Sequence, residues 1–481
     1  MKGYILAGEE VQDTNYLEVV NPSSGEPFEK VSSITSESVA EKALEEAISA
    51  FHKFKRTSLK DRAKILLNAV KIIEEKREHL ARVLAMEAGK PIKDSRVEIL
   101  RAISVFRIAA EETRFVLEGK VHRVDAYEYP PGNENRIVME VREPIGVVLA
   151  ILPFNFPANS FAHKVAPNIM AGNTIIVKPS TLTPLSAIEM GKILYEAGLP
   201  KGVLSVLVGP SKVVAEPLIK DMRVAGITFT GSTVTGTEIA SKAVLTGKKI
   251  MMEMGGSDPV IVFDDADLSK AVPIIAKARF EYAGQNCNAG KRIIVHEKIY
   301  DKFVELYRTE VAKFRVGDAL SEETDVGPLI SKDAVESMRK FVTDAEEKGK
   351  TILRLQNPPS KGYYFPLSII VNADLSLSSM KEEVFGPIAP IAKFSTEEEA
   401  VEIANSTHYG LQSSMFTADV RRGLRVAQEM EFGAVMINNS TRLRWDALPF
   451  GGVKMSGLGN KEGVRNTILG MTESKLISLE L

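Results

Sequence analysis

Residues 145–152 read Ile145-Gly146-Val147-Val148-Leu149-Ala150-Ile151-Leu152, and the turn Pro153-Phe154-Asn155-Phe156-Pro157 follows them directly. An unbroken apolar run that ends in turn residues predicts a strand buried on both faces of a sheet. Similar apolar runs, separated by helical segments, follow at residues 173–177, 203–208 and 226–230. This alternation predicts an α/β fold in which crossover helices cover a parallel sheet. A second stretch of the same kind extends from about residue 259 to residue 436.

The chain before residue 145 has a different, helical pattern. Apolar residues between Ala40 and Phe51 recur at the spacing of one helix face, and more helix is predicted over 62–76 and 79–87. A polar loop at residues 130–135 separates this part from the alternating part. With 481 residues, 44% of them hydrophobic, the chain is large enough for two or three domains.

The charge of the chain is nearly balanced, with 61 basic and 63 acidic residues and a net charge of −2. This balance provides no broad field for binding nucleic acid or an anionic membrane surface. The longest apolar run is far shorter than the roughly 18 residues of a membrane span, and the first ten residues lack the apolar core of a signal peptide. We therefore expect no nucleic-acid or membrane partner and a reduced, cytoplasmic setting.

The only cysteine, Cys287, lies in the run Gly284-Gln285-Asn286-Cys287-Asn288-Ala289-Gly290. Since one thiol cannot form an intramolecular disulfide, it is a buried apolar side chain, a metal ligand or a nucleophile. No histidine or second cysteine lies nearby in the sequence, so we expect no metal site. Burial is the commonest state of a free cysteine. The glycine-flanked, amide-rich setting of Cys287 nevertheless favours a nucleophile.

A second motif, Met252-Glu253-Met254-Gly255-Gly256, precedes the cysteine in the chain. A carboxylate at the end of an apolar, strand-like stretch is poorly solvated, and burial raises the pKa of a carboxyl group toward neutrality. Such a group suits a general base that accepts a proton from water. The alternative for Glu253 is a local cap or ion pair. Together, Glu253 and Cys287 would allow a thioester to form and then be hydrolysed.

A third candidate is Asn155, in the turn that ends the first predicted strand. A side-chain amide at this place can donate a hydrogen bond to a developing oxyanion. An asparagine that only stabilises a turn is equally plausible on local grounds. We therefore predict Cys287, Glu253 and Asn155 as the catalytic residues.

Seven segments of the chain, taken in order, resemble the landmarks of the aldehyde dehydrogenase superfamily. They are Pro153-Phe154-Asn155-Phe156-Pro157, Val177-Lys178-Pro179-Ser180, Phe229-Thr230-Gly231-Ser232, Glu253-Met254-Gly255-Gly256, Gly284-Gln285-Asn286-Cys287, Glu382-Glu383-Val384-Phe385-Gly386-Pro387 and Pro449-Phe450-Gly451-Gly452. The resemblance covers essentially the whole chain. It implies that the protein oxidises an aldehyde to a carboxylate through a cysteine thiohemiacetal and a thioester, with a nicotinamide dinucleotide as cofactor.

The same resemblance implies two parallel-sheet α/β domains and a small β oligomerisation piece. We assign residues 1–120 and 142–254 to a dinucleotide-binding domain and residues 255–448 to a catalytic domain. Residues 121–141 and 465–481 would form the oligomerisation strands, with a hairpin joining the C-terminal strand at a subunit contact. The partner is then a second copy of the chain, in a homodimer or homotetramer.

The cofactor site lacks the usual Gly-x-Gly-x-x-Gly pattern, and the nearest match, residues 457–463, has one residue too many. Residues 229–232 instead end a strand and open a helix, whose free N–H groups suit a pyrophosphate. The resemblance implies that Lys178 meets the adenosine ribose, Glu383 the nicotinamide ribose, and Phe385 the nicotinamide ring. The cofactor-binding residues expected from it are Lys178, Ser180, Phe229, Gly231, Ser232, Glu383 and Phe385.

One departure from the family concerns the choice of cofactor. Many NAD-preferring members place a glutamate three residues after the lysine at position 178, where this chain has Thr181. A carboxylate there would repel the 2′-phosphate of NADP, whereas threonine leaves space and Lys178 can pair with the phosphate. Lys212 is a candidate for a second cation, with a solvated loop lysine as the alternative. We expect NADP, with NAD possible.

The substrate is expected to contact Asn286, Arg442, Arg444 and Phe450. The segment 438–446 is polar and lacks an aromatic collar, which favours a small hydroxyaldehyde such as glyceraldehyde or lactaldehyde. An arginine pointing inward would instead favour glyceraldehyde 3-phosphate, oxidised without phosphorylation, or succinate semialdehyde. Structural ion pairs at a subunit contact are a third role for the arginines. Two alternatives from other classes are a thiol hydrolase and a non-catalytic relative.

Overall fold

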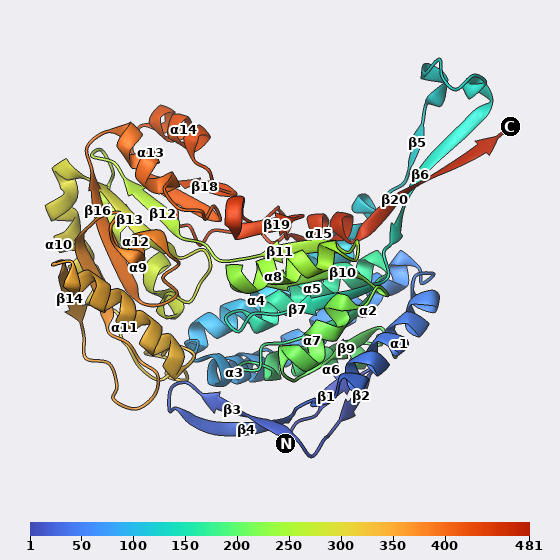
Figure 1. Cartoon of the computed structure of the whole chain (residues 1–481), viewed down its shortest axis with the longest axis horizontal. Helices are drawn as coiled ribbons and strands as arrows, with labels where there is room; N and C mark the ends of the chain where they lie inside the picture. Colours follow the sequence, from blue (N-terminus) through green and yellow to red (C-terminus); the bar gives the residue numbers. More distant parts are fainter.

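Two parallel-rich sheets, each covered by helices, form the body of the protein, and a β arm projects from it (Figure 1). The computed structural model describes all residues from 1 to 481. No helix is both long enough and apolar enough to cross a membrane. The two sheets lie side by side, so that the chain passes from the first to the second directly after Glu253.

The first sheet has the strand order β19-β11-β10-β7-β8-β9-β1-β2. Its five middle strands, from β11 to β9, are parallel, while β19, β1 and β2 are antiparallel additions at the edges. The strands are β1 (Tyr4–Leu6), β2 (Glu9–Val11), β7 (Val147–Ile151), β8 (Thr174–Lys178), β9 (Leu204–Val206), β10 (Val224–Thr230), β11 (Lys249–Glu253) and β19 (Gly457–Gly459). The strand β7 is buried along its whole length, as its unbroken apolar sequence predicts.

Helices cover both faces of this sheet (Figure 1). They are α1 (Glu37–Phe54), α2 (Leu59–Glu75), α3 (Arg77–Ala88), α4 (Ile92–Val116), α5 (Pro157–Ala171), α6 (Leu185–Glu196), α7 (Ser211–Lys220), α8 (Thr233–Val244) and α15 (Val464–Gly470). The helices predicted before residue 100 are confirmed as α1, α2 and α3. The most buried helix is α5, which starts at Pro157 immediately after the turn that carries Asn155 and packs against α4 and α15. This packing fixes the turn relative to the sheet.

The second sheet has the order β14-β15-β16-β13-β12-β17-β18, in which only β14 is antiparallel to its neighbour. Its strands are β12 (Asp258–Val262), β13 (Gly290–His296), β14 (Thr351–Leu355), β15 (Leu367–Ala373), β16 (Ile388–Phe394), β17 (Gln412–Phe416) and β18 (Ala434–Ile437). Its helices are α9 (Leu268–Phe280), α10 (Tyr300–Val311), α11 (Lys332–Glu347), α12 (Ser378–Lys381), α13 (Glu397–Asn405) and α14 (Val420–Glu429). The two parallel-sheet α/β units predicted from the sequence are therefore present.

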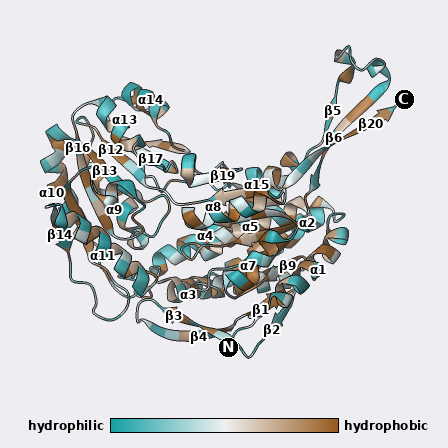
Figure 2. Ribbon diagram, viewed as in Figure 1, coloured by the Kyte–Doolittle hydropathy of each residue, from teal (hydrophilic) through white to brown (hydrophobic).

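The projecting arm is a three-stranded antiparallel sheet of β5 (Lys120–His122), β6 (Arg136–Pro144) and β20 (Thr472–Glu480). Val121, Leu476 and Leu479 on these strands are apolar and exposed. Figure 2 shows hydrophobic residues along the ribbon of the arm. The strand β6 runs past residue 141 to Pro144 because its pairing with β20 continues as far as Thr472. A separate hairpin of β3 (Tyr16–Asn21) and β4 (Glu26–Ser32) lies at the N-terminal side of the body. The division into functional domains at residues 120, 141, 254 and 448 stays a prediction.

Candidate active site

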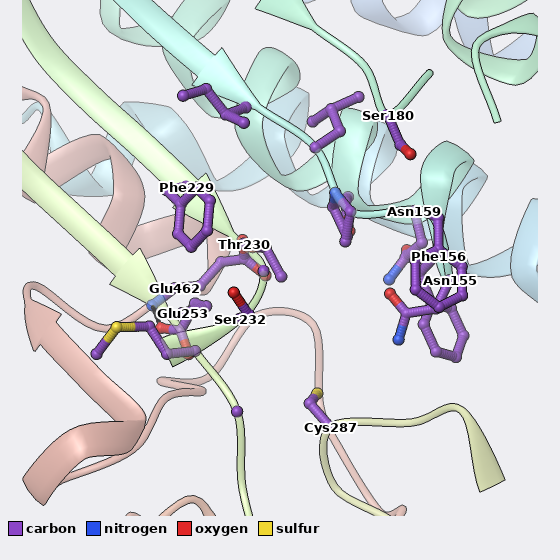
Figure 3. Close-up of a pocket in the computed structure, with 18 of the residues that line it drawn as sticks. Asn155, Phe156, Asn159, Ser180, Phe229, Thr230, Ser232, Glu253, Cys287 and Glu462 are labelled. Atoms are coloured by element: carbon purple, nitrogen blue, oxygen red, sulfur yellow. Dashed lines mark hydrogen bonds between the residues drawn. The ribbon is translucent and has the colours of Figure 1, made fainter. Parts of the chain in front are cut away.

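A cavity of about 520 Å³ lies where the carboxyl ends of the first sheet's parallel strands face the second unit. In Figure 3, Cys287 lies below a gap that has Asn155 and Phe156 on one side and Glu253 and Glu462 on the other. Most of the residues expected in the site line this cavity: Asn155, Lys178, Ser180, Thr181, Phe229, Gly231, Ser232, Glu253, Cys287, Glu383, Phe385, Arg442, Arg444 and Phe450. The fold thus brings segments far apart in the sequence into one site.

The Cys287 thiol is partly exposed to this cavity. Its loop follows three consecutive left-handed residues, Tyr282 (φ 52°), Ala283 (φ 51°) and Gly284 (φ 71°). A Cβ atom at Gly284 would lie 2.6 Å from the Gly386 carbonyl oxygen, so this close approach requires glycine. Burial raises the pKa of the Cys287 thiol to about 11, and the positive charge of Lys291 opposes that rise. The Cys287 thiol is therefore held by a constrained loop and lies near a cation.

The side-chain amide of Asn155 lies against the nucleophile loop. Its Nδ2 donates a hydrogen bond to the Gln285 carbonyl oxygen over 2.9 Å, which leaves its second N–H without a partner in the chain. The backbone N–H of Cys287 also donates no hydrogen bond within the chain. Both unused donors belong to residues that line the cavity, so they are suited to hold an oxyanion formed beside the thiol.

Glu253 is the last residue of β11, and it is almost completely buried. Its Oε1 accepts a hydrogen bond from the Glu462 backbone N–H over 3.1 Å, whereas Oε2 has no partner. A Cβ atom at Gly451 would lie 2.4 Å from Oε1, which explains why glycine is required in that motif. Burial raises the pKa of Glu253 to about 8, and the negative charge of Glu462 adds to the effect. A carboxyl group in this state is suited to accept a proton near neutral pH.

Glu462 is a residue of the site that sequence reasoning missed. It is buried and forms ion pairs with Lys164 (2.8 Å) and Arg444 (2.9 Å). Burial opposes its ionisation, but the charges of Lys164 and Arg444 outweigh burial and hold the pKa of this carboxyl well below its usual range. Glu462 lies within the glycine pattern 457–463, which is one residue too long for the usual dinucleotide fingerprint. That segment supplies a charged neighbour of Glu253.

The cofactor side of the cavity contains an unpaired cation and free backbone donors. Lys178 ends β8 and is buried, and its ammonium group has no hydrogen bond or ion pair in the chain, while burial lowers its pKa to about 8. The Ser232 side chain caps only the Thr235 N–H of helix α8, so the N–H groups of Thr233 and Val234 have no acceptor. A helix N-terminus and a buried lysine without a counter-charge together favour a phosphorylated ligand.

Two expected residues do not line the cavity. Lys212 is exposed in the first turn of α7, where its neighbour Ser211 reaches the cavity instead. Asn286 is fully buried behind the nucleophile loop, and its Nδ2 donates to the Glu281 carbonyl oxygen over 2.9 Å. Neighbouring side chains of this tight loop point in different directions, so that Cys287 faces the cavity and Asn286 does not. The structure therefore does not place Asn286 beside the substrate.

Each arginine that lines the cavity is paired with a carboxylate. Arg444 pairs with Glu462, and Arg101 pairs with Asp446 over 2.7 Å. The sequence did not predict Arg101 as a residue of the site. Arg442 pairs with Glu281 over 3.2 Å and also contacts the Asn288 side-chain oxygen. These ion pairs form within one chain, whereas the sequence-based alternative placed them at a subunit contact. The arginines thus contribute hydrogen-bonding edges to the cavity, and each already contacts a carboxylate of the chain.

The cavity therefore combines a thiol, two free N–H donors beside it, a buried carboxyl group with a raised pKa and a phosphate-binding helix end. A sequence profile described as the aldehyde dehydrogenase family matches residues 9–477. The chain belongs to this family. The resemblance, the fold class and the enzyme class predicted from the sequence are thereby confirmed, so the protein is an aldehyde dehydrogenase.

Individual members of the aldehyde dehydrogenase family share most of their length with this chain. Lactaldehyde dehydrogenase of Methanocaldococcus jannaschii is 42% identical over 96% of both chains. A 3-sulfolactaldehyde dehydrogenase of Priestia megaterium is 37% identical and covers all of this chain and 98% of its own. The crystal structure of glyceraldehyde-3-phosphate dehydrogenase GapN from M. jannaschii, complexed with NADP, has a TM-score of 0.91 and 40% identity, over 98% of this chain and 100% of that chain.

Proposed function

We propose that this aldehyde dehydrogenase oxidises a small, neutral hydroxyaldehyde, such as glyceraldehyde or lactaldehyde, with NADP as hydride acceptor. The observation that carries the choice of substrate is the charge balance of the cavity. Arg101, Arg442 and Arg444 all line it, and each already contacts a carboxylate, with Glu462 shared between Arg444 and Lys164. A cavity with polar edges whose arginines are already engaged by carboxylates suits hydroxyl groups better than a phosphate or a carboxylate.

In the first step of the proposed reaction, the Cys287 thiolate attacks the aldehyde carbon. The carbonyl oxygen gains a negative charge as the carbon becomes tetrahedral. The free N–H of Asn155 and the backbone N–H of Cys287 hold that oxygen. The product of this step is a thiohemiacetal on Cys287.

Loss of hydride from the thiohemiacetal oxyanion re-forms the carbon–oxygen double bond and leaves a neutral thioester on Cys287. A nicotinamide dinucleotide bound in the cavity would supply the hydride acceptor. The chain's own residues place the reacting carbon: Cys287 holds it covalently, and Phe385 and Glu383 line the same cavity where the nicotinamide end is expected. Phe154 packs edge-on against Phe385, with ring centroids 5.8 Å apart, and so supports that face of the site.

Hydrolysis of the thioester completes the cycle. Glu253 accepts a proton from water, the water oxygen attacks the acyl carbon, and the carbon–sulfur bond breaks to release the carboxylate and the Cys287 thiol. The raised pKa of Glu253 supports this role, because its ionised form is a stronger base than an ordinary carboxylate. Its Oε2 is buried and has no hydrogen-bond partner in the chain, so it is the oxygen left to accept the proton of the water.

A second candidate substrate is an anionic three- or four-carbon aldehyde. Relatives named for 3-sulfolactaldehyde and glyceraldehyde 3-phosphate favour it, and succinate semialdehyde belongs to the same class. For such a substrate, Arg101 or Arg442 would have to exchange its carboxylate partner for the anion of the substrate.

A substrate panel tests the choice between neutral and anionic aldehydes. We expect glyceraldehyde or lactaldehyde to give the highest kcat/KM, above glyceraldehyde 3-phosphate, succinate semialdehyde and benzaldehyde. The reason is that an anion must compete with a carboxylate already paired to each arginine. An anionic substrate that wins by tenfold, with its advantage lost in Arg101→Ala or Arg442→Ala, would refute the proposal. Arg444 is unsuitable for this test because it pairs with Glu462, the neighbour of the base.

The residues at the cofactor end fit NADP. Lys178 supplies an uncompensated cation, and the α8 N-terminus supplies free N–H groups for the pyrophosphate. Thr181 and Ser180 line the cavity near Lys178 and carry no charge, so nothing at these positions repels a 2′-phosphate. A phosphate beside Lys178 would also restore the protonation that burial disfavours. NAD, which lacks the phosphate, would bind in the same place with less charge complementarity.

Replacing Thr181 with glutamate should shift the cofactor preference from NADP toward NAD. The new carboxylate would face the 2′-phosphate and is expected to raise the Kd of NADP about tenfold or more, since like charges repel strongly at a partly buried site. Fluorescence titration with both cofactors measures the effect, and Thr181→Gln serves as a control of similar size without the charge. A wild type that already prefers NAD, together with an unchanged T181E variant, would show that the cofactor assignment is wrong.

We also infer that the arm of β5, β6 and β20 is covered by a second copy of the chain, in a homodimer or homotetramer. The support is the projection of the arm from the body (Figure 1). A second support is the exposure of the apolar residues Leu476, Ile477 and Leu479 on β20. A solution mass of one chain would contradict this inference. The reactive thiol further suits a cytoplasmic setting, where thiols remain reduced.

A further inference from the structure

Lys291 is a buried lysine that neither the sequence motifs nor the proposed reaction uses. It lies on β13 and its side chain has no exposed surface. Its ammonium group donates to three oxygens: Gly256 O (2.6 Å), Cys287 O (2.7 Å) and Glu383 Oε1 (2.6 Å). An ammonium group has three N–H bonds, so all of its donors are satisfied and its position is fixed.

The three acceptors of Lys291 come from three segments that meet only in the folded chain. Gly256 follows the base Glu253, Cys287 is the nucleophile, and Glu383 is the carboxylate expected to bind the nicotinamide ribose. A lysine buried to this degree is costly unless its charge is compensated. Here Glu383 is its ion-pair partner. The arrangement therefore depends on all three segments being in place.

The geometry at Glu383 gives its two oxygens different tasks. Oε1 accepts from Lys291 and from the Gly256 backbone N–H (3.2 Å). Oε2 lies so close to Gly255 that a Cβ atom there would be 2.2 Å away. The carboxylate lines the cavity, and Oε2 takes no hydrogen bond from the chain. Lys291 thus holds one oxygen and leaves the other free for a ligand in the cavity.

We propose that Lys291 is a positioning residue that aims Glu383 at the cofactor ribose, holds the Cys287 loop by its carbonyl, and stabilises the Cys287 thiolate by its charge. The ribose part of this inference rests on the proposed function. The thiolate part follows from the charges around Cys287: Lys291 and Arg442 are the cations that face it, and Asp258 and Glu383 are the acids. Asp258 is completely buried, and burial raises its pKa well above the usual range, so Glu383 is the counter-charge of Lys291.

Alkylation of the single thiol by iodoacetamide, without aldehyde or cofactor, tests the thiolate part. Lys291→Met should slow alkylation at pH 7 about tenfold, because removal of a nearby cation lowers the thiolate fraction. Glu383→Gln should accelerate it about two- to threefold, because the charge of Lys291 is then no longer offset. Opposite signs in the two variants are the mark of a charge effect, since a merely structural disturbance of the loop would not produce them. Alkylation that is unchanged or faster in Lys291→Met would overturn the proposal.

Binding of NADP, measured by titration, tests the positioning part. Lys291→Met should raise the Kd about tenfold because Glu383 loses the partner that orients it. Lys291→Arg, which keeps the charge, should retain an alkylation rate within about threefold of the wild type. Lys248→Met is the matched control: Lys248 is also buried and donates to the Asp221 carbonyl oxygen at the opposite end of β11, so both readouts should stay unchanged. An unchanged NADP Kd in Lys291→Met would overturn the positioning role.

The readouts separate this inference from the proposed function. A wild type that alkylates as expected but oxidises no aldehyde would refute the function and leave the role of Lys291 at the thiol standing. If the wild type oxidises aldehydes but is alkylated at the same rate as Lys291→Met, only the role of Lys291 is refuted. If Lys291→Met does not fold, as circular dichroism would show, Glu383→Gln decides: faster alkylation supports the proposal and slower or equal alkylation overturns it.

Discussion

Cys287→Ala is expected to abolish aldehyde oxidation, with kcat/KM falling by at least about 10⁴-fold, and to abolish any esterase activity. The substitution removes the sulfur that forms both covalent intermediates, and the chain has no second cysteine to replace it. NADP binding should remain close to that of the wild type, because the proposed cofactor contacts, Lys178 and the α8 N-terminus, do not include the thiol. The measurements are NADPH formation at 340 nm and a fluorescence titration with NADP.

The single thiol makes the control for this variant unusually simple. Iodoacetamide should add one group to the wild type and none to Cys287→Ala, and alkylated wild type should be as inactive as the variant. Retention of even a tenth of the activity in either protein would rule out Cys287 as the nucleophile. Loss of NADP binding in the variant would point instead to a folding defect.

Glu253→Gln is expected to separate the two halves of the reaction. The variant should form about one equivalent of NADPH rapidly and then stop, with the steady-state rate reduced by about 10² to 10⁴-fold. Hydride leaves before the base is needed, so only hydrolysis of the thioester suffers. The amide fills the same space beside Gly451 and the Glu462 N–H, which limits structural change. Rapid-quench kinetics with mass analysis of the acylated protein would detect the burst and the trapped thioester.

The pH dependence of hydrolysis provides the control for Glu253. Only the ionised carboxylate accepts a proton, and the pKa of Glu253 is raised to about 8. In the wild type, the rate of thioester hydrolysis should therefore rise with pH through about 8 and level off above it. The Glu253→Gln variant should lack this titration. A variant that shows neither burst nor thioester, although it binds NADP normally, would contradict the assignment of the base.

Local patterns in the chain were enough to predict much of the architecture. The run 145–152 became β7, and the apolar runs after it became β8, β9 and β10, because a strand buried on both faces must be apolar throughout. The periodic segment around Ala40 became α1, because a helix that packs on one side must be apolar along that face. The pattern of apolar residues that burial requires lies within each short segment, so it can be recognised from the sequence.

The three catalytic candidates were visible for a related reason. Each is chemically out of place in its own segment: a thiol among glycines and amides, a carboxyl at the end of an apolar strand, and an amide between two prolines. Such local conflicts mark positions where function outweighs stability. The structure places Cys287, Glu253 and Asn155 around one cavity, while their chemical roles stay predictions for the variants above.

Charge pairing, in contrast, was decided only by how distant segments pack. Lys164 and Glu462, and likewise Arg101 and Asp446, come from opposite parts of the chain, so no short segment shows that they neutralise each other. The same holds for Lys291, whose three acceptors belong to segments that are far apart in the sequence. The sequence shows which residues carry a charge and of which sign. Whether that charge is free for a ligand depends on electrostatic partners within a few ångströms, and those are set by the tertiary fold alone.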